Sequence, residues 1–423
     1  MKKAIVVTAL FILSCFCVVD GRAYLGMDGN PIILFLSLLV MAGWYLYILR
    51  REVADVPLLP ARIPAAITGA LVGMIGIGIT VPFFDKLFEQ YNNPGSLSDV
   101  ITQLDVLYTR YASGVFPYYP LEEYSWHPYP VYMPLNWLPL ALSHLLKVDN
   151  RWVGILLMLL ANGLWGAFVW RHAVNITIKI VAVLLPVVML LFYTKWAGMD
   201  ISVSLETMIA AYYMVLAIGL ASKNIYLITA GLILCLLSRY TMIFWLPLFA
   251  IIYWQNIPRK ANIGMWAAVA LAFLIFYILP FYIKDPSILK DGVAYHNHCA
   301  IEEWKGYGEE RISYTFVPGV YFASFFRNWL PGAIDQQVFI MRAIQGSLMI
   351  LLNIAGLLYY RKHKGSIDYA KFCLVMLFLF LVFFYMFSPL LYKYYHIVTL
   401  SIAAIIGGMI LLSGSKGRVG HSK

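Results

Sequence analysis

The sequence predicts an all-α fold: a polytopic membrane helix bundle of about twelve transmembrane helices, with interfacial helices in the first large outer loop. Composition is the first observation behind this prediction, because 62% of the 423 residues are hydrophobic and only 12% are charged. The second is a series of apolar runs of about 20 residues, the length that crosses a bilayer. The third is the position of Lys and Arg at the ends of these runs. Because Lys and Arg cluster at these span ends, the net charge of +10 reflects the orientation of the chain in the membrane and does not indicate nucleic-acid binding.

Ten apolar runs are each predicted to form one span. They cover residues 4–19, 31–49, 63–84, 152–170, 176–194, 201–221, 263–283, 337–359, 369–387 and 391–413. The first run resembles a signal peptide, but no small-x-small cleavage site follows it, so it predicts an uncleaved span. The stretch 225–254 is too long for one span and is interrupted at Ser238-Arg239-Tyr240. It therefore predicts two short helices that meet in a hairpin.

The positive-inside rule orients the predicted spans. Most Lys and Arg residues fall in turns on one side when both termini are cytoplasmic, and loops 85–133 and 284–336 then lie outside. A bacterial inner membrane is the simplest setting for this topology. Residues 1–62 are expected to form an N-terminal transmembrane hairpin, and residues 63–423 the core. One cysteine, Cys299, lies in a long loop, so no disulfide or metal-type spacing is indicated.

Loop 85–133 predicts a short amphipathic helix. Ser98 is a candidate cap, and apolar residues follow it at helical spacing up to Gly114, where the helix is expected to end. Asp99 is then predicted in the first turn of this helix. An aromatic and proline-rich stretch follows, and segment 134–147, too short for a span, is expected to lie as an amphipathic helix at the outer interface.

Three motifs in this region carry a family resemblance: Asp99, then Gly114-Val115-Phe116-Pro117-Tyr118, then Tyr132-Met133-Pro134-Leu135. The arrangement resembles the GT-C superfamily of integral-membrane glycosyltransferases, which use polyprenyl-phosphate sugars as donors. Among its members the polyprenol-phosphate-mannose-dependent mannosyltransferases look most similar. The resemblance extends in span order over 63–413, so that 63–423 would be a GT-C-like catalytic core. It departs from the family in the residue after Asp99, which is Val100 rather than a second acid, and in the single proline of the third motif.

The chemistry of such a transfer assigns roles to particular residues. A carboxylate acting as general base activates an acceptor hydroxyl, and Asp99 is predicted in this role with Asp105 as its rival. The departing lipid phosphate needs cations or a divalent metal ion; the candidate cations are Arg239, Lys393, His396 and Arg311. A platform for sugar and lipid is predicted from the aromatic residues Tyr118, Trp126, Tyr129, Tyr132 and Trp137. Asp200 and Glu206 are further acids expected near the same cavity.

Plainer interpretations exist for these residues. Asp99 fits an ordinary helix-start carboxylate, the aromatic residues fit a membrane-interface belt, and Arg239 fits an interfacial arginine. Loop 284–336 contains His296 and His298 with several glutamates; an acceptor-binding or lid role is weighed there against a zinc site and a solvated loop. For the whole chain, the alternatives are a transporter or lipid flippase, an O-antigen ligase or polymerase acting on diphosphate-linked lipids, and a non-catalytic scaffold.

Overall fold

The computed structural model describes residues 2–51, 63–92, 98–124, 127–306, 319–390 and 392–413. Within these ranges the fold is a bundle of helices with no β-strand element, and nine helical segments are long and apolar enough to cross a membrane. The helices that form these nine segments, alone or together with a neighbouring turn or helix, are α1 (Lys2–Val19), α2 (Gly21–Arg51), α3 (Ile63–Gly78), α7 (Arg151–Trp170), α8 (Ile176–Trp196), α13 (Arg259–Phe273), α16 (Ile334–His363), α17 (Tyr369–Met386) and α18 (His396–Leu412). The all-helical character predicted from the sequence is confirmed, and the nine segments are compatible with a multi-pass membrane protein.

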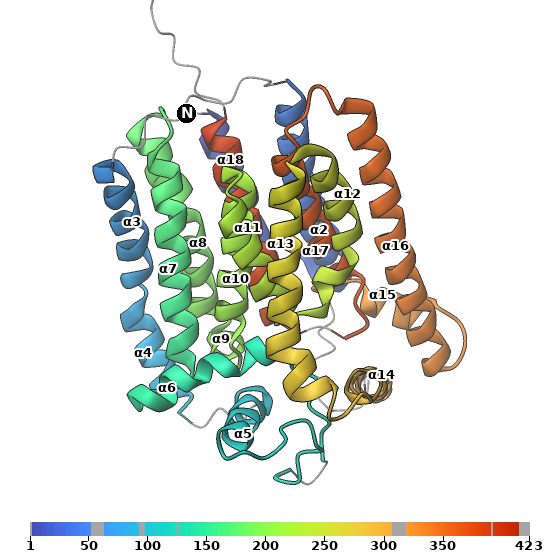
Figure 1. Cartoon of the computed structure of the whole chain (residues 1–423). Coiled ribbons are helices and arrows are strands. Elements are labelled where there is room, and N and C mark those ends of the chain that lie inside the picture. The colour runs from blue at the N-terminus through green and yellow to red at the C-terminus, as the bar shows by residue number, and fades with distance from the viewer. Residues whose placement is uncertain are drawn as a thin grey trace, which may run out of the picture.

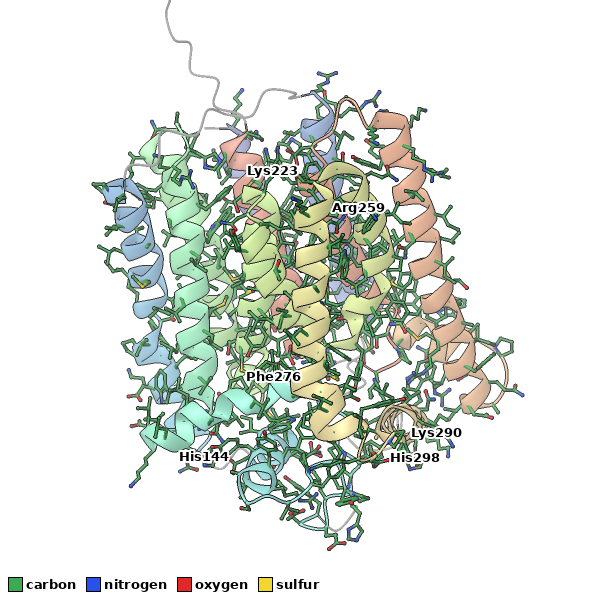
Figure 2. All side chains as sticks on the ribbon, viewed as in Figure 1. His144, Lys223, Arg259, Phe276, Lys290 and His298 are labelled. Carbon is green, nitrogen blue, oxygen red and sulfur yellow. The ribbon has the colours of Figure 1, made fainter. Side chains whose placement is uncertain are left out.

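The bundle has two different ends (Figure 1). One end, which we call the loop end, carries short elements: α4 (Val81–Gln90), α5 (Val100–Ala112), α6 (Ala141–Leu146), α9 (Gly198–Ser202) and α14 (Ile288–Gly306). At the opposite end the first and last helices meet, since Lys3 Nζ donates a hydrogen bond to Ser413 Oγ at 3.3 Å. Figure 2 shows His144, Lys290 and His298 at the loop end, with Lys223 and Arg259 toward the other.

Helix α18 lies in the centre of the bundle. Every one of its residues is buried, and it packs against α1, α2, α8, α10 (Glu206–Ser222) and α17. The first two helices also pack against α8 and α17, respectively, and the hydroxyls of Ser14 and Ser37 join them at 2.8 Å. The N-terminal hairpin is therefore packed into the same interior as the rest of the chain.

The hairpin predicted within 225–254 is confirmed. Helix α11 (Ile225–Leu236) ends before Arg239, a 3-10 turn η4 (Tyr240–Phe244) follows, and α12 (Leu246–Asn256) completes the segment. The flanking residues Lys223 and Arg259 lie toward the same end of the bundle, so α11 leads into the bundle and α12 leads back (Figure 2). Arg239 is thus placed inside the bundle, away from the end at which the hairpin begins.

The span predicted at 201–221 is wrong in one respect, because the helix is broken. Residues 203–205 separate α9 from α10. The buried guanidinium of Arg151 lies against the break: its Nη1 donates to the carbonyls of Ser202 at 3.3 Å and Tyr91 at 2.9 Å, and its Nη2 donates to the Phe88 carbonyl at 3.2 Å. These bonds satisfy carbonyl groups that lie at the ends of helices.

The first loop helix is confirmed as α5, and Gly114 after it has φ +76°, a left-handed conformation that glycine adopts without strain. Segment 134–147 consists of two 3-10 turns, η2 (Pro134–Asn136) and η3 (Leu138–Leu140), followed by α6. Figure 1 shows this segment lying across the loop end instead of along the bundle axis. The second long loop differs from the polar loop weighed above, because it contains the 19-residue helix α14 and the shorter α15 (Ala323–Trp329).

A seam of small residues joins α3 to α7. A methyl group added at Gly69 would overlap the Gly166 carbonyl, and one added at Gly166 would overlap the Gly69 carbonyl. The side-chain amide of Asn162 adds a hydrogen bond of 2.8 Å to the Gly73 carbonyl. Small residues that let two backbones approach are a usual means of joining helices in membranes. This seam fixes α3 against α7.

Candidate active site at the loop end

Asp99 stands at the N-cap position of α5, one residue before the first turn in which it was predicted. The Ser98 hydroxyl accepts a 3.3 Å hydrogen bond from the Val100 amide, whereas the Asp99 side chain makes no capping bond. Asp99 Oδ2 instead accepts a 2.6 Å hydrogen bond from Nε2 of Gln103, one turn further along. Burial raises the pKa of Asp99 above its usual range, and the bond from Gln103 opposes that rise. A carboxylate with a raised pKa is suited to accept a proton.

Tyrosines from three distant segments surround Asp99. Burial raises the pKa of Tyr132, Tyr295 and Tyr392, and the Asp99 carboxylate contributes to each rise. These residues belong to the stretch after α5, to α14, and to the turn before η6 (Lys393–Tyr395). The Asp99 carboxylate also contributes to the raised pKa of the Cys299 thiol on α14. Residues of both long loops and of the turn before the last helix therefore lie within the electrostatic influence of Asp99.

Asp105, the predicted rival of Asp99, has different partners. Its Oδ1 lies 2.7 Å from His144 Nε2 and accepts a 2.7 Å hydrogen bond from the side-chain amide of Asn150. These contacts tie α5 to α6 and to the start of α7. The carboxylate of Asp105 thus holds the elements of the loop end together, while that of Asp99 faces the tyrosines.

Arg239 lies in extended backbone between α11 and η4. Its guanidinium forms an ion pair with Glu206, the first residue of α10, and lies 4.6 Å from the ring centroid of Tyr395. Both charged side chains are largely buried, at 16% and 5% exposure. Arg239 Nε and Glu206 Oε2 have no hydrogen-bond partner among the described residues. A buried charge pair that is only partly satisfied is costly, and in membrane proteins such groups commonly mark a functional site.

The Tyr132–Leu135 motif docks on the chain break next to Arg239. The Leu135 amide donates to the Leu237 carbonyl at 2.9 Å, and the Asn136 side chain donates to the Ser238 carbonyl at 2.7 Å. These bonds satisfy backbone groups that the break would otherwise leave unpaired. The positive charge of Arg239 lowers the pKa of the Tyr132 hydroxyl, against the larger effect of burial, which raises it. The fold therefore brings together the third sequence motif and the candidate phosphate-binding arginine.

Lys393 and His396 lie at the start of the last helix. Lys393 Nζ is 3.9 Å from Asp200 of α9, and the Lys393 carbonyl accepts a 3.1 Å hydrogen bond from the Tyr193 hydroxyl. Burial raises the pKa of Asp200, and the charge of Lys393 opposes that rise. The His396 side chain is buried, with neither ring nitrogen hydrogen-bonded to a described residue. Lys393 thus lies close to the carboxylate of Asp200, and the His396 ring lies in the interior of the bundle.

The predicted aromatic platform is divided by the structure. Tyr118 and Trp137 are buried, and both pack edge-on against Phe281 at 5.2 and 5.6 Å between ring centroids. The Tyr118 hydroxyl donates to the Tyr132 carbonyl at 2.9 Å, so Tyr118 holds the backbone of the Tyr132–Leu135 motif in place. Tyr129 is partly exposed, and burial raises its pKa to about 12, with a smaller contribution from nearby acids. Trp126 and Arg311 lie outside the described residues.

The helix α14 supplies site residues that were not singled out from the sequence. Tyr295, Cys299 and Glu303 recur every four residues and share one face of the helix. Both Glu303 and Asp99 influence the Cys299 thiol, whose pKa burial raises. The Trp304 indole donates to the Pro389 carbonyl at 2.7 Å and fixes the helix beside the turn before η6. The four-residue spacing was the available signal, and it was overlooked because the region was treated as a loop.

Metal ligation is not supported by the part of the chain that the structure describes, which contains no cluster of three or more His, Cys, Asp or Glu residues able to hold an ion. His296 and His298 lie two residues apart on α14 and so point in different directions. The buried or partly buried cations described above are side chains, Arg239 paired with Glu206 and Lys393 close to Asp200.

Compared with protein-family models, curated proteins and solved structures, the chain matches none of them. The inference of function therefore starts from the groups that the fold gathers at the loop end. These are a carboxylate of raised pKa, a buried arginine and a lysine that each contact an acid, and a shell of tyrosines.

Proposed function

We propose that this chain is a GT-C-like membrane glycosyltransferase. It would move a sugar, a hexose such as mannose, from a polyprenyl-phosphate donor to a hydroxyl of a lipid, glycan or protein acceptor. The observation that carries the proposal is the docking of the Tyr132–Leu135 motif on the chain break next to Arg239, through the hydrogen bonds of Leu135 and Asn136, at the end of the bundle that also carries Asp99. An anion-binding cation and a proton-accepting carboxylate are the two groups that this transfer needs close together.

The proposed reaction is a single displacement at the anomeric carbon. Asp99 takes the proton of the acceptor hydroxyl as its oxygen forms the new bond to that carbon. The bond from the anomeric carbon to the phosphate oxygen breaks, and its electron pair leaves with the polyprenyl phosphate. Arg239 and Lys393 stabilise the charge that develops on the phosphate. Asp105 is not assigned a chemical role, because His144 and Asn150 already engage its carboxylate.

The proposal includes a membrane topology of twelve spans, in which α10, α11 and α12 join the nine longer segments. The contact between Lys3 and Ser413 supports an even number of crossings, since it places both ends of the bundle on one side. The loop end would face outward, with α5 and α6 at the interface, and both termini would be cytoplasmic. A lipid-linked donor in a bacterial inner membrane would then present its sugar to Asp99.

Sugar transfer from a labelled polyprenyl-phosphate donor tests this function, with the wild type and Asp99→Asn compared in membranes at matched expression. We expect Asp99→Asn to lose about 100-fold or more in rate, within the usual range for a general base. Asp105→Asn is the matched control and should retain most of the activity. Equal loss in both variants would remove Asp99 from the role of base.

Two further arms separate the alternatives. Wild-type transfer that survives a metal chelator would assign the phosphate charge to the protein's own cations. A flippase would instead move the labelled lipid across vesicles without cleaving the sugar–phosphate bond, with or without Asp99. A ligase acting on diphosphate-linked lipids would use that donor class in preference and would tolerate Asp99→Asn.

A further inference from the structure

The two cations nearest the tyrosine shell are each paired with an acid, and both acids come from one short stretch of chain. Arg239 pairs with Glu206, and Lys393 lies 3.9 Å from Asp200. Arg239 and Lys393 are more than 150 residues apart in the sequence and belong to different elements, whereas the acids lie within 200–206. A single segment thus neutralises charges that arrive from separate parts of the fold.

The backbone of 200–206 is held in place independently of the cations. The Ser202 carbonyl accepts a hydrogen bond from Arg151, whose guanidinium is itself fixed by Asp149 with Nε–Oδ1 at 2.9 Å. The Ser204 hydroxyl donates to the Asp200 carbonyl at 3.3 Å. Arg151 is buried, and it contacts Asp149 and the carbonyls of Phe88, Tyr91 and Ser202 rather than either cation. Its role is therefore to fix the backbone at the helix break. The break then presents the two carboxylates from a rigid base.

Neither ion pair uses the full capacity of its cation. Arg239 Nε and Glu206 Oε2 are buried without a hydrogen-bond partner among the described residues, and the Lys393–Asp200 contact is at the long limit for an ion pair. Arginine and carboxylate planes that meet to stabilise a fold usually do so through two parallel bonds. The incomplete pairing leaves N–H donors for another anion.

The charge of the ligand changes during the proposed reaction. A sugar-linked polyprenyl phosphate is a diester with one negative charge, and the released polyprenyl phosphate is a monoester that carries close to two at neutral pH. Two cations and two carboxylates sum to zero before any ligand arrives. The product is attracted more strongly than the donor by Arg239 and Lys393 and repelled more strongly by Asp200 and Glu206, so the two carboxylates limit how tightly the product is held.

Resting on the proposed function, we propose that Asp200 and Glu206 are positioning residues that act as internal counter-anions: they hold Arg239 and Lys393 in the empty site and limit how tightly the product phosphate is held. The lipid phosphate takes their place on the cations during the reaction. As the product leaves, the carboxylates return to the cations.

Binding of a polyprenyl monophosphate to the purified full-length chain in nanodiscs tests this proposal, together with steady-state transfer. We expect Asp200→Asn to bind the monophosphate about 5–10-fold more tightly, since one repelling charge is removed at a partly exposed site. Its kcat should fall and inhibition by added product should strengthen, while KM for the donor does not rise. Glu206→Gln should show a larger effect in the same direction.

Controls separate this role from a structural one. Glu302→Gln removes the same charge from an exposed residue that pairs with Lys305, and it should leave product binding unchanged. The double variant Asp200→Asn, Lys393→Gln should lose the tightening, because Asp200 acts through Lys393. Wild-type binding that Asp200→Asn leaves unchanged or weakens would overturn the counter-anion role alone. A wild type that binds no polyprenyl monophosphate would overturn the proposed function as well.

Discussion

Replacing Gln103 by Met should move the acid limb of the pH–rate profile upward. Gln103 is buried and donates a 2.6 Å hydrogen bond to Asp99 Oδ2, and this bond favours the ionised carboxylate. Because a base must be ionised to accept a proton, the rate falls as pH drops through the pKa of Asp99. Burial already raises that pKa, so the wild-type limb should lie above about 3.9, the ordinary value for Asp.

The size of the shift follows from the lost hydrogen bond. A hydrogen bond to a charged group contributes about 1.5–3 kcal/mol, and one pKa unit corresponds to about 1.36 kcal/mol. The loss would therefore raise the pKa by about 1–2 units, and partial exposure of Asp99 to solvent favours the lower end of this range. Met is chosen because it keeps the length of Gln without a donor.

The assay is kcat/KM for sugar transfer between pH 4.5 and 8 in detergent. Gln103→Glu should move the limb further than Met does, because a second carboxylate repels the charge on Asp99. Asp105→Asn should leave the limb in place. A limb that stays fixed in Gln103→Met, or moves to lower pH, would show that Asp99 is not the group that titrates.

Three other outcomes are expected. Arg239→Ala should cost about 3–5 kcal/mol of stability in thermal unfolding, because Glu206 is left buried and unpaired; the double variant Arg239→Met, Glu206→Leu should recover stability without recovering transfer. Cys299 is the one cysteine that is not buried, so a maleimide should block transfer, faster at higher pH because the thiol pKa is raised, and Cys299→Ser should resist. Gly166→Ala should lower both melting temperature and transfer, since its methyl group meets the Gly69 carbonyl; a melting temperature equal to wild type would contradict this packing.

Much of the fold could be predicted from the sequence because lipid constrains it strongly. Apolar length identified the main spans, and a single arginine within an apolar run identified the break between α11 and α12. The break between α9 and α10 carries no such signal in its own residues. The contact made there, a hydrogen bond from Arg151 to the Ser202 carbonyl, comes from about fifty residues earlier in the chain.

The candidate site could be predicted only in part. Asp99 and Arg239 stand out by residue type, and the structure brings them to a common neighbour in Tyr132. Tyr118 and Trp137 were expected to face a ligand, yet their rings are covered by Phe281, which comes from a segment more than 140 residues later. Which face of an aromatic ring is covered depends on such distant contacts, and local sequence does not contain them.

The glycine seam between α3 and α7 bears on how the activity of this chain would respond to random mutagenesis. Main partners of α3 are α7 and α8, and its surface against α7 has no room for a methyl group at Gly69 or Gly166. Substitutions at Gly69 or Gly166 would then abolish turnover from a distance. A screen that scores turnover alone would rank these glycines beside the reacting groups. A parallel measurement of the amount of folded protein would separate variants that disturb helix packing from variants that lack a reacting side chain.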